Sequence, residues 1–457
     1  SLGTDMVKIL GQEVAILLAL WANLISWIVR RLAPSLLPHL IPICPEEDSA
    51  PSPDSTLDTR TVCISIGRPG GTEQLRTVTL MKGLATCGYN ATDIKSPFIR
   101  YLPPALPSDA VVLANHAFSI NFADCAIRWG LYTSATDRVG YPIVPGFDVA
   151  GVVESVGSAV TAFAVGDRVF GVTLFGAYSS RVVLPSLQLR AIPDGVSMEE
   201  AASIPTVALT ALYSLHLAGQ WPSRSLLTNR AVLVHSAAGG VGGMLVQMAK
   251  LLDLAPVFGV VGRVDKVESA RALGCDVVID KSGEDLWEAA GKAAPKGYGA
   301  VMDSNGVSTL QASYDHLGLT GRLIVFGFHT NLPMGNDVLD PLEWIRMAFK
   351  QARMPRFHPM EMGNDNKAVL AFNLSFFADE SKVVESMLDQ ICCWLRDGKL
   401  RCPRVEKLPM EEVCRAHEMI QSGKTVGKLV LKTKNATGDY FRSGSLGMQD
   451  SIYSTAS

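Results

Sequence analysis

The 457-residue chain has no excess of either charge and no dense cluster of cysteines. Its 41 lysines and arginines nearly balance 44 aspartates and glutamates, and no basic stripe with interleaved aromatic residues is present. This argues against a protein dedicated to nucleic-acid binding. The nine cysteines are dispersed and odd in number. We therefore expect free thiols in a reducing compartment, the cytoplasm or an organelle matrix or stroma, and no disulfide framework.

A glycine-rich turn between a strand and a helix is the most informative segment present. Residues 231–234 form an apolar run typical of a central parallel strand, and residues 244–252 carry apolar side chains at helical spacing. Glycines permit the sharp turn between them and let a pyrophosphate approach the positive start of the helix. A glycine turn alone is more often an ordinary loop, but the flanking elements favour a phosphate site. The predicted phosphate-binding residues are Ala238, Gly239, Gly240, Val241 and Gly242.

Strands and helices continue to alternate after this turn. The pattern predicts strands at 256–261, 277–279, 300–303 and 322–326, with helices at 265–273, 285–294 and 307–317 between them. Helical connections of this kind imply right-handed crossovers and a parallel sheet covered on both faces. The expected fold class is α/β, with a doubly wound Rossmann dinucleotide-binding domain.

Basic side chains occupy the place that selects between nicotinamide cofactors. A carboxylate about 20 residues beyond the turn binds the ribose of NAD, whereas cations accept a 2′-phosphate. This chain has Arg263 and Lys266 there, and Lys281 follows the third strand. NADPH is therefore the predicted cofactor. Asp265 complicates this, because it either caps the next helix or repels the phosphate; the alternative is a solvated helix start whose cations touch nothing.

Several further motifs precede the glycine turn in close order. They are Asn121–Asp124 (NFAD), Arg128–Tyr132 (RWGLY), Pro145–Gly157 (PGFDVAGVVESVG) and Val165–Val169 (VGDRV). Together with the turn, they resemble the medium-chain dehydrogenase/reductase superfamily, and within it the zinc-free quinone oxidoreductase branch (zeta-crystallin/VAT-1-like), over residues 60–434. The resemblance implies a GroES-like, partly open β-barrel catalytic domain beside the Rossmann domain. Ser119 and Lys281 depart from the pattern of the branch.

The zinc ligands of the superfamily's alcohol dehydrogenases are missing from the sequence. Those enzymes use a cysteine and a Gly-His-Glu segment, because tetrahedral zinc takes thiolate and imidazole donors. Asn121 stands in place of the cysteine, and Phe147 and Asp148 replace the histidine and glutamate. A phenylalanine cannot bind a metal. No metal site is therefore predicted.

The resemblance also implies roles for individual residues. Asn121 is expected beside the nicotinamide and the substrate, Tyr132 in the cleft, and Thr210 against the nicotinamide carboxamide. Each has a structural alternative: Asn121 satisfies a buried turn, Tyr132 packs with its hydroxyl in water, and Thr210 caps the following helix. Phe326 and Gly327 are likewise core and turn residues in the alternative interpretation. The expected cofactor groove adds Gly240, Val241, Arg263, Lys266, Lys281, Ser304, Phe326 and Gly327.

Without a metal, the expected chemistry is hydride transfer from NADPH to a small acceptor that polarises its own electrons. A quinone or an α,β-unsaturated carbonyl has this property, and the protein then orients the reactants and excludes water. Two alternatives remain open. One is a structural or accessory subunit of a membrane complex that retains the reductase fold, and the other is an enoyl-reductase module of a polyketide-type synthase.

Pattern changes along the chain predict its domains. The catalytic domain is expected in two pieces, 61–207 and 367–434, around a Rossmann domain at 208–366 that ends with an amphipathic helix at 342–350. A Pro- and Ser-rich linker at 45–60 precedes it, and a Gly/Ser-rich tail at 435–457, expected to be disordered, follows. A homodimer through the sheet edge of the Rossmann domain is also expected.

The first 44 residues have the most unusual composition. The run 14–29 is apolar apart from Asn23 and Ser26, and Arg30 and Arg31 end it. As a helix it reaches about 24 Å, slightly less than the roughly 30 Å hydrocarbon core of a bilayer. An N-terminal apolar helix is expected, as a short membrane anchor, an interfacial or docked helix, or a targeting peptide; a buried core helix is the structural alternative. We therefore predict membrane association through residues 14–31.

Overall fold

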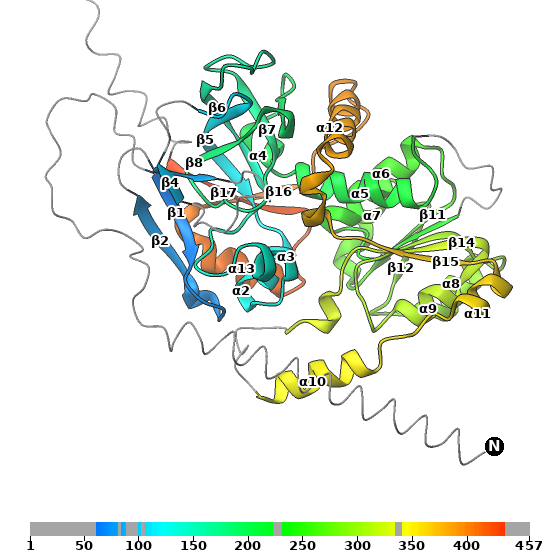
Figure 1. Cartoon of the computed structure of the whole chain (residues 1–457). Coiled ribbons are helices and arrows are strands. Elements are labelled where there is room, and N and C mark those ends of the chain that lie inside the picture. The colour runs from blue at the N-terminus through cyan, green and yellow to red at the C-terminus, as the bar shows by residue number, and fades with distance from the viewer. Residues whose placement is uncertain are drawn as a thin grey trace, which may run out of the picture.

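The computed structural model describes residues 61–80, 84–87, 99–101, 106–222, 231–333 and 341–434. Two sheet-based units lie side by side over this range (Figure 1). The expected apolar helix at 14–31, the linker at 45–60 and the tail at 435–457 lie outside the described residues. Among the helices of the described residues, none combines the length and the apolar character needed to cross a membrane.

The second unit is a parallel sheet of six strands in the order β12-β11-β10-β13-β14-β15. All residues of β10 and β11 are buried, which explains their continuous apolar sequence. The prediction of a doubly wound Rossmann domain is confirmed. Its strands are β10 (Val232–Val234), β11 (Val257–Val261), β12 (Val277–Asp280), β13 (Tyr298–Asp303), β14 (Leu317–Val325) and β15 (Ala368–Ala371). Its helices are α5 (Pro205–Leu217), α6 (Gly240–Leu251), α7 (Val267–Leu273), α8 (Leu286–Ala293) and α9 (Leu310–Asp315).

The sixth strand, β15, was not predicted from the sequence. It has four residues, and it follows the helices α10 (Pro341–Ala352) and α11 (Pro359–Asp365). We expected the chain to return to the catalytic domain at residue 367. Instead, β15 pairs in parallel with β14 and forms one edge of the Rossmann sheet. The chain pairs with the catalytic sheet again only at β16 (Val405–Pro409) and β17 (Lys428–Lys432).

The first unit is built around the long strand β5 (Ala110–Ser119), which is almost entirely buried. β5 pairs in antiparallel fashion with β6, β8 and β17, so the last strand of this unit lies beside one of its first. This arrangement agrees with the expected GroES-like domain. Its other strands are β1 (Thr61–Ile66), β2 (Leu75–Leu80), β3 (Leu84–Cys87), β4 (Ile99–Tyr101), β6 (Asp148–Val156), β7 (Arg168–Val172), β8 (Arg181–Pro185) and β9 (Leu189–Ala191). Its helices are α2 (Phe122–Trp129), α3 (Thr133–Arg138), α4 (Met198–Ala202) and α13 (Val413–Gln421).

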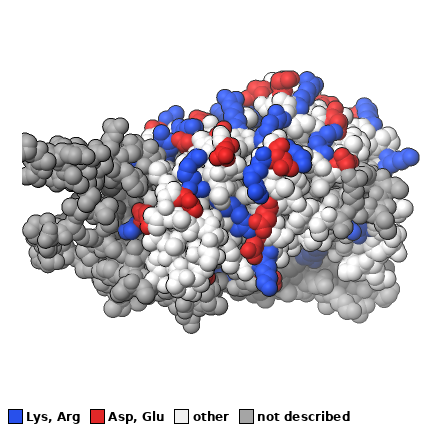
Figure 2. Space-filling model, turned by 90° about the horizontal axis from the view of Figure 1, so that it is seen from above, with Lys and Arg blue, Asp and Glu red and all other residues white. Residues whose placement is uncertain are grey.

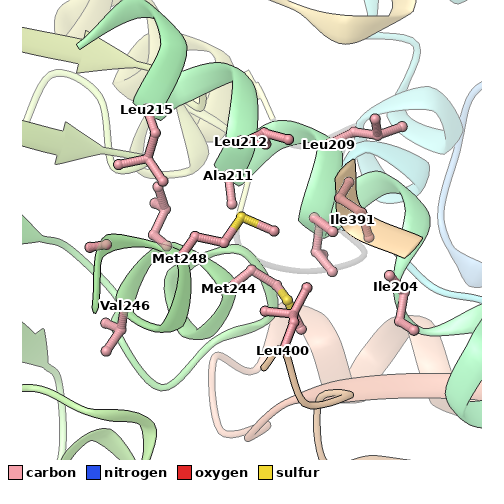
Figure 3. Packing of buried hydrophobic residues seen from close by; sticks show 14 of the residues in the cluster. Ile204, Leu209, Ala211, Leu212, Leu215, Met244, Val246, Met248, Ile391 and Leu400 are labelled. Atoms are coloured by element: carbon pink, nitrogen blue, oxygen red, sulfur yellow. The ribbon is translucent and has the colours of Figure 1, made fainter. Parts of the chain in front are cut away.

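Helix α5 is mostly apolar and mostly buried, because other helices pack against it on several sides. Leu212 of α5 and Met244 of α6 are both buried, and Ile391 of α12 (Ser381–Arg396) belongs to the same apolar cluster (Figure 3). α12 contacts α5 as well as the short helix at Ser186–Gln188 in the catalytic unit. This cluster therefore joins the two units through apolar packing.

Charged side chains of both signs are intermingled on the face of the molecule seen from above (Figure 2). That face has no continuous basic stripe. All cysteines whose side chains the structure describes are free thiols: Cys63, Cys125, Cys275, Cys392, Cys393, Cys402 and Cys414.

We expect Leu212→Ala to lower the free energy of unfolding by about 2–5 kcal/mol, because it leaves a cavity in the apolar cluster that joins the two units. Leu319→Ala is the matched control, since Leu319 is 70% exposed and its loss should change stability by less than about 0.5 kcal/mol. Urea denaturation followed by circular dichroism measures both. Equal effects of the two substitutions would contradict this account of the core.

Candidate active site

A cavity of about 560 Å³ lies where the two units meet, and residues of both line it. Helix α2 and the strand β7 contribute from the catalytic unit, and the β10–α6 turn contributes from the Rossmann unit. Of the site residues predicted from the sequence, those that line the cavity are Asn121, Tyr132, Thr210, Gly239, Gly240, Val241, Gly242, Ser304, Phe326 and Gly327. Ala238, Arg263, Lys266 and Lys281 do not line it.

The glycine turn is shaped as a phosphate site requires. Gly239 is the N-cap of α6, and the free amides of the first helical turn lie at the cavity. A Cβ at Gly242 would lie 2.2 Å from the carbonyl oxygen of Ser236, so only glycine allows the helix to pack this closely on the turn. Ser236 itself has a φ of 55°, which tightens the turn further. These residues fit a bound diphosphate.

The glycine turn is also bonded to the catalytic unit. The backbone N–H of Gly427 donates to the carbonyl of Ala238 at 3.2 Å, and Gly239 and Gly427 form a parallel bridge. Ala238 is thus a contact between the two units and is not exposed in the cavity. A Cβ at Gly240 would lie 2.9 Å from Cδ of Lys428, so α6 starts directly against this lysine.

The three basic residues expected at the adenosine end have different environments. Arg263 is held by Asp265 in two contacts of 2.9 and 2.5 Å, with both side chains nearly half exposed. Lys266 donates to the carbonyls of Gly423 at 2.8 Å and Thr425 at 2.9 Å. Lys281 lies near the tip of β11, where its Cε is 3.4 Å from the place of a Cβ on Gly262. Arg263 and Lys266 are thus engaged by groups of this chain, and their role at a 2′-phosphate stays a prediction.

Asn121 is fixed between a buried cation and a buried anion. Its Nδ2 donates to Oδ2 of Asp148 at 2.8 Å, and its Oδ1 accepts from Nζ of Lys428 at 2.8 Å. Lys428 also donates to the carbonyl of Ile120 at 2.9 Å, and its Nζ lies 3.8 Å from Asp148. The amide dipole of Asn121 is therefore aligned by charges on both sides. Burial lowers the pKa of Lys428, while the negative charge of Asp148 opposes that shift.

Asp148 connects this network to α5. Its Oδ1 accepts from the backbone N–H of Thr206 at 2.7 Å and from the Thr206 hydroxyl at 2.6 Å. Its Oδ2 accepts from Ser119, one of the two residues that depart from the pattern of the branch. A serine at position 119 thus supplies one more donor to a carboxylate that is fully buried.

Tyr132 and Thr210 lie in the cavity wall with their hydroxyls already engaged. The hydroxyl of Tyr132 donates to Oδ1 of Asn373 at 2.9 Å, and its ring packs edge-on against Phe147 and Phe175. Burial raises the pKa of Tyr132, so its proton is retained at neutral pH. Thr210 lies inside α5 and donates to the carbonyl of Thr206 at 2.7 Å. It does not cap that helix.

Sequence reasoning missed two histidines that also line the cavity. Nε2 of His235 lies 3.1 Å from the Ser313 hydroxyl, which donates to the buried Asp303 at 2.8 Å. His329 packs edge-on against Phe122, and burial lowers its pKa to about 4. Both follow β-strands of the Rossmann sheet, where polar residues at the carboxyl ends are the available signal.

Asn121 and Phe147 stand where the alcohol dehydrogenases of the superfamily have zinc ligands, and both line the cavity. Within the described part of the chain, no group of three or more histidines, cysteines, aspartates or glutamates is arranged to hold a metal ion. Zinc independence stays a prediction.

Two protein families match the chain. Residues 107–194 match the alcohol dehydrogenase GroES-like domain, and residues 273–431 match the family described as zinc-binding dehydrogenase. The VAT-1 homolog of Danio rerio, a synaptic vesicle membrane protein, is 31% identical over 77% of this chain and 70% of its own length. A quinone oxidoreductase of Pseudomonas aeruginosa is 30% identical over 72% of this chain and 93% of its own length. The chain belongs to the medium-chain dehydrogenase/reductase superfamily, in its quinone oxidoreductase and VAT-1-like branch.

Solved structures of this branch have the same fold. The quinone oxidoreductase of Pseudomonas syringae superposes with a TM-score of 0.64 at 28% identity, over 81% of this chain and 99% of that one. The Escherichia coli quinone oxidoreductase complexed with NADPH gives 0.63 at 26% identity over the same shares. The expected family is confirmed, and so is the α/β fold with its GroES-like and Rossmann domains. The chain is therefore an oxidoreductase of this family.

We expect the half-buried His329 to make the protein less stable in mild acid. Its pKa falls from 6.5 to about 4 on folding, so the stability present above pH 6.5 is lost as the pH falls toward 4. At about pH 5 this loss amounts to about 2 kcal/mol. Urea unfolding at about pH 7 and about pH 5 measures it, and His329→Phe should lose about that much less between the two. The same loss in parent and variant would show that His329 is not buried as a neutral imidazole.

Proposed function

We propose that the protein is an NADPH-dependent, zinc-independent reductase that transfers hydride to a quinone or an α,β-unsaturated carbonyl. The observation that carries this proposal is that the glycine turn and Asn121 line the same cavity. The relatives support the substrate class, since they include quinone oxidoreductases and a 2-haloacrylate reductase of Burkholderia that is 32% identical over 70% of this chain. Acceptors of both kinds carry an activated double bond.

In this proposal, each part of the site has a separate role. The glycine turn binds the diphosphate, and Arg263 with Lys281 binds the 2′-phosphate. NADPH supplies the hydride when bound. Asn121, aligned by Lys428 and Asp148, orients the reacting groups, and the apolar walls at Phe147 and Phe326 exclude water. His329 lines the cavity, and its neutral imidazole carries one ring N–H that can hydrogen-bond the oxygen of the acceptor. The hydroxyl of Tyr132 can do so only by giving up its hydrogen bond to Asn373.

The proposal includes association with a membrane through residues 14–31, and a homodimer. Relatives named as synaptic vesicle membrane proteins support the first. The edge strand β15 supports the second, because an edge offers unpaired backbone groups to another copy of the chain.

The purified chain should oxidise NADPH in the presence of a small quinone, and added chelator should not change the rate.

Arg263→Ala should raise the Kd for NADPH by about tenfold or more, because one charge-assisted contact is lost, and should leave the Kd for NADH unchanged. Arg271→Ala is the matched control, since Arg271 is an exposed arginine of α7. Calorimetry measures binding and loss of nicotinamide absorbance measures turnover. Failure to bind either coenzyme would overturn the proposal.

We expect Lys428→Met to lower kcat by about 10- to 100-fold, because it frees the amide of Asn121 to rotate away from its aligned position. The Kd for NADPH should change far less. Lys432→Met, on the same strand, is the control and should keep the parent rate. Since Lys428→Met also leaves Asp148 without its cation, the double variant Lys428→Met/Asp148→Asn tests the same point without a buried lone charge. Parent kcat in both variants would contradict a positioning role.

A further inference from the structure

Helix α10 presents an apolar stripe to solvent. Leu342, Ile345 and Phe349 are 61%, 54% and 63% exposed, and their spacing of three and four residues places them on one face. Large apolar side chains with this much exposure are few among the described residues, and no other described helix carries three of them. In a helix with no role beyond the fold, these apolar side chains would pack against the rest of the protein.

The opposite face of α10 is anchored on the protein. Trp344 packs in the small apolar cluster around Cys125 and Trp129, and Nζ of Lys350 donates to the carbonyl of Thr330 at 2.7 Å. The stripe is therefore held outward by contacts on the other side of the helix. α10 lies along one side of the molecule, away from β6 and β7 (Figure 1).

Cations outnumber carboxylates in α10 and in the segment that follows it. Between residues 341 and 358 the sequence has one carboxylate, Glu343, against four cations. The guanidinium of Arg353 lies 6.0 Å from the ring of Phe349, so charge and apolar surface are adjacent. Of the four cations, Arg346 pairs with Glu343 and Lys350 is bonded to the carbonyl of Thr330. The other two are the exposed Arg353 and Arg356.

We propose that α10 is an interfacial helix that lies on an anionic lipid surface, with Leu342, Ile345 and Phe349 in the acyl boundary. An apolar face flanked by arginine and lysine is the composition of such helices, and anionic headgroups complement the cations. A second copy of the chain would bring like charges together on this face. The apolar run at 14–29 has Glu13 before it and Arg30 and Arg31 after it, so it offers far less negative charge than an anionic lipid surface.

The position of α10 relates this surface to the cavity. Leu332 belongs to the same cluster as Trp344 and also lines the cavity, and Phe328, 43% exposed, lines it as well. A lipid surface beneath α10 therefore lies beside the segment that forms one wall of the cavity. Docking itself does not depend on the proposed reductase activity.

Hydrogen exchange of the full chain, with and without vesicles of phosphatidylserine and phosphatidylcholine, tests the proposal at this helix. Exchange in 341–353 should slow by about tenfold or more on these vesicles, because burying the stripe disfavours local opening. Vesicles of phosphatidylcholine alone should give a smaller effect. Measuring the helix directly separates its contact from any attachment through residues 14–31.

The double variant Ile345→Glu/Phe349→Glu should abolish this protection. Val165→Glu/Leu319→Glu adds the same charge at two other exposed apolar positions, 66% and 70% exposed, and should keep it. Unchanged exchange in 341–353 when the protein is bound to vesicles would overturn the proposal. So would protection that appears without vesicles and rises with protein concentration, because that result assigns the face to a second copy.

Discussion

The site depends on one backbone contact between the two units, the hydrogen bond from Gly427 to the carbonyl of Ala238. It fixes the glycine turn of the Rossmann domain against the last strand of the catalytic sheet. The next residue along that strand, Lys428, then lies against the start of α6 and reaches Asn121. The proposed diphosphate end and the proposed reacting end of the cavity are thereby positioned by the same few residues. A shift of this strand would displace both at once.

Charge compensation orders the proposed reacting end of the cavity. A buried lysine and a buried aspartate are each costly alone, and the amide of Asn121 between them satisfies part of both. Ser119 and Thr206 complete the donors to Asp148. An asparagine held in this way has little rotational freedom, which a side chain that only closed a turn would not need.

Periodicity was sufficient to predict the buried strands of the Rossmann sheet, because β10 and β11 are apolar throughout and are followed by glycine or helical signals. It was not sufficient for β15, whose four residues follow a long helical insertion and resemble any short apolar run. The same distinction holds in the cavity. Motif residues such as Asn121 and Gly240 were found, whereas Lys428 lies about 300 residues away from its partner and carries no local signal.

The tie between Lys266 and the carbonyls of Gly423 and Thr425 has a consequence for ligand entry. This ammonium group spans the junction of the two units, and burial already lowers its pKa. An anion that binds this ammonium group competes with the two carbonyls of the loop before β17. Binding of such an anion and the contact between the two units are then coupled, and each can be measured through the other.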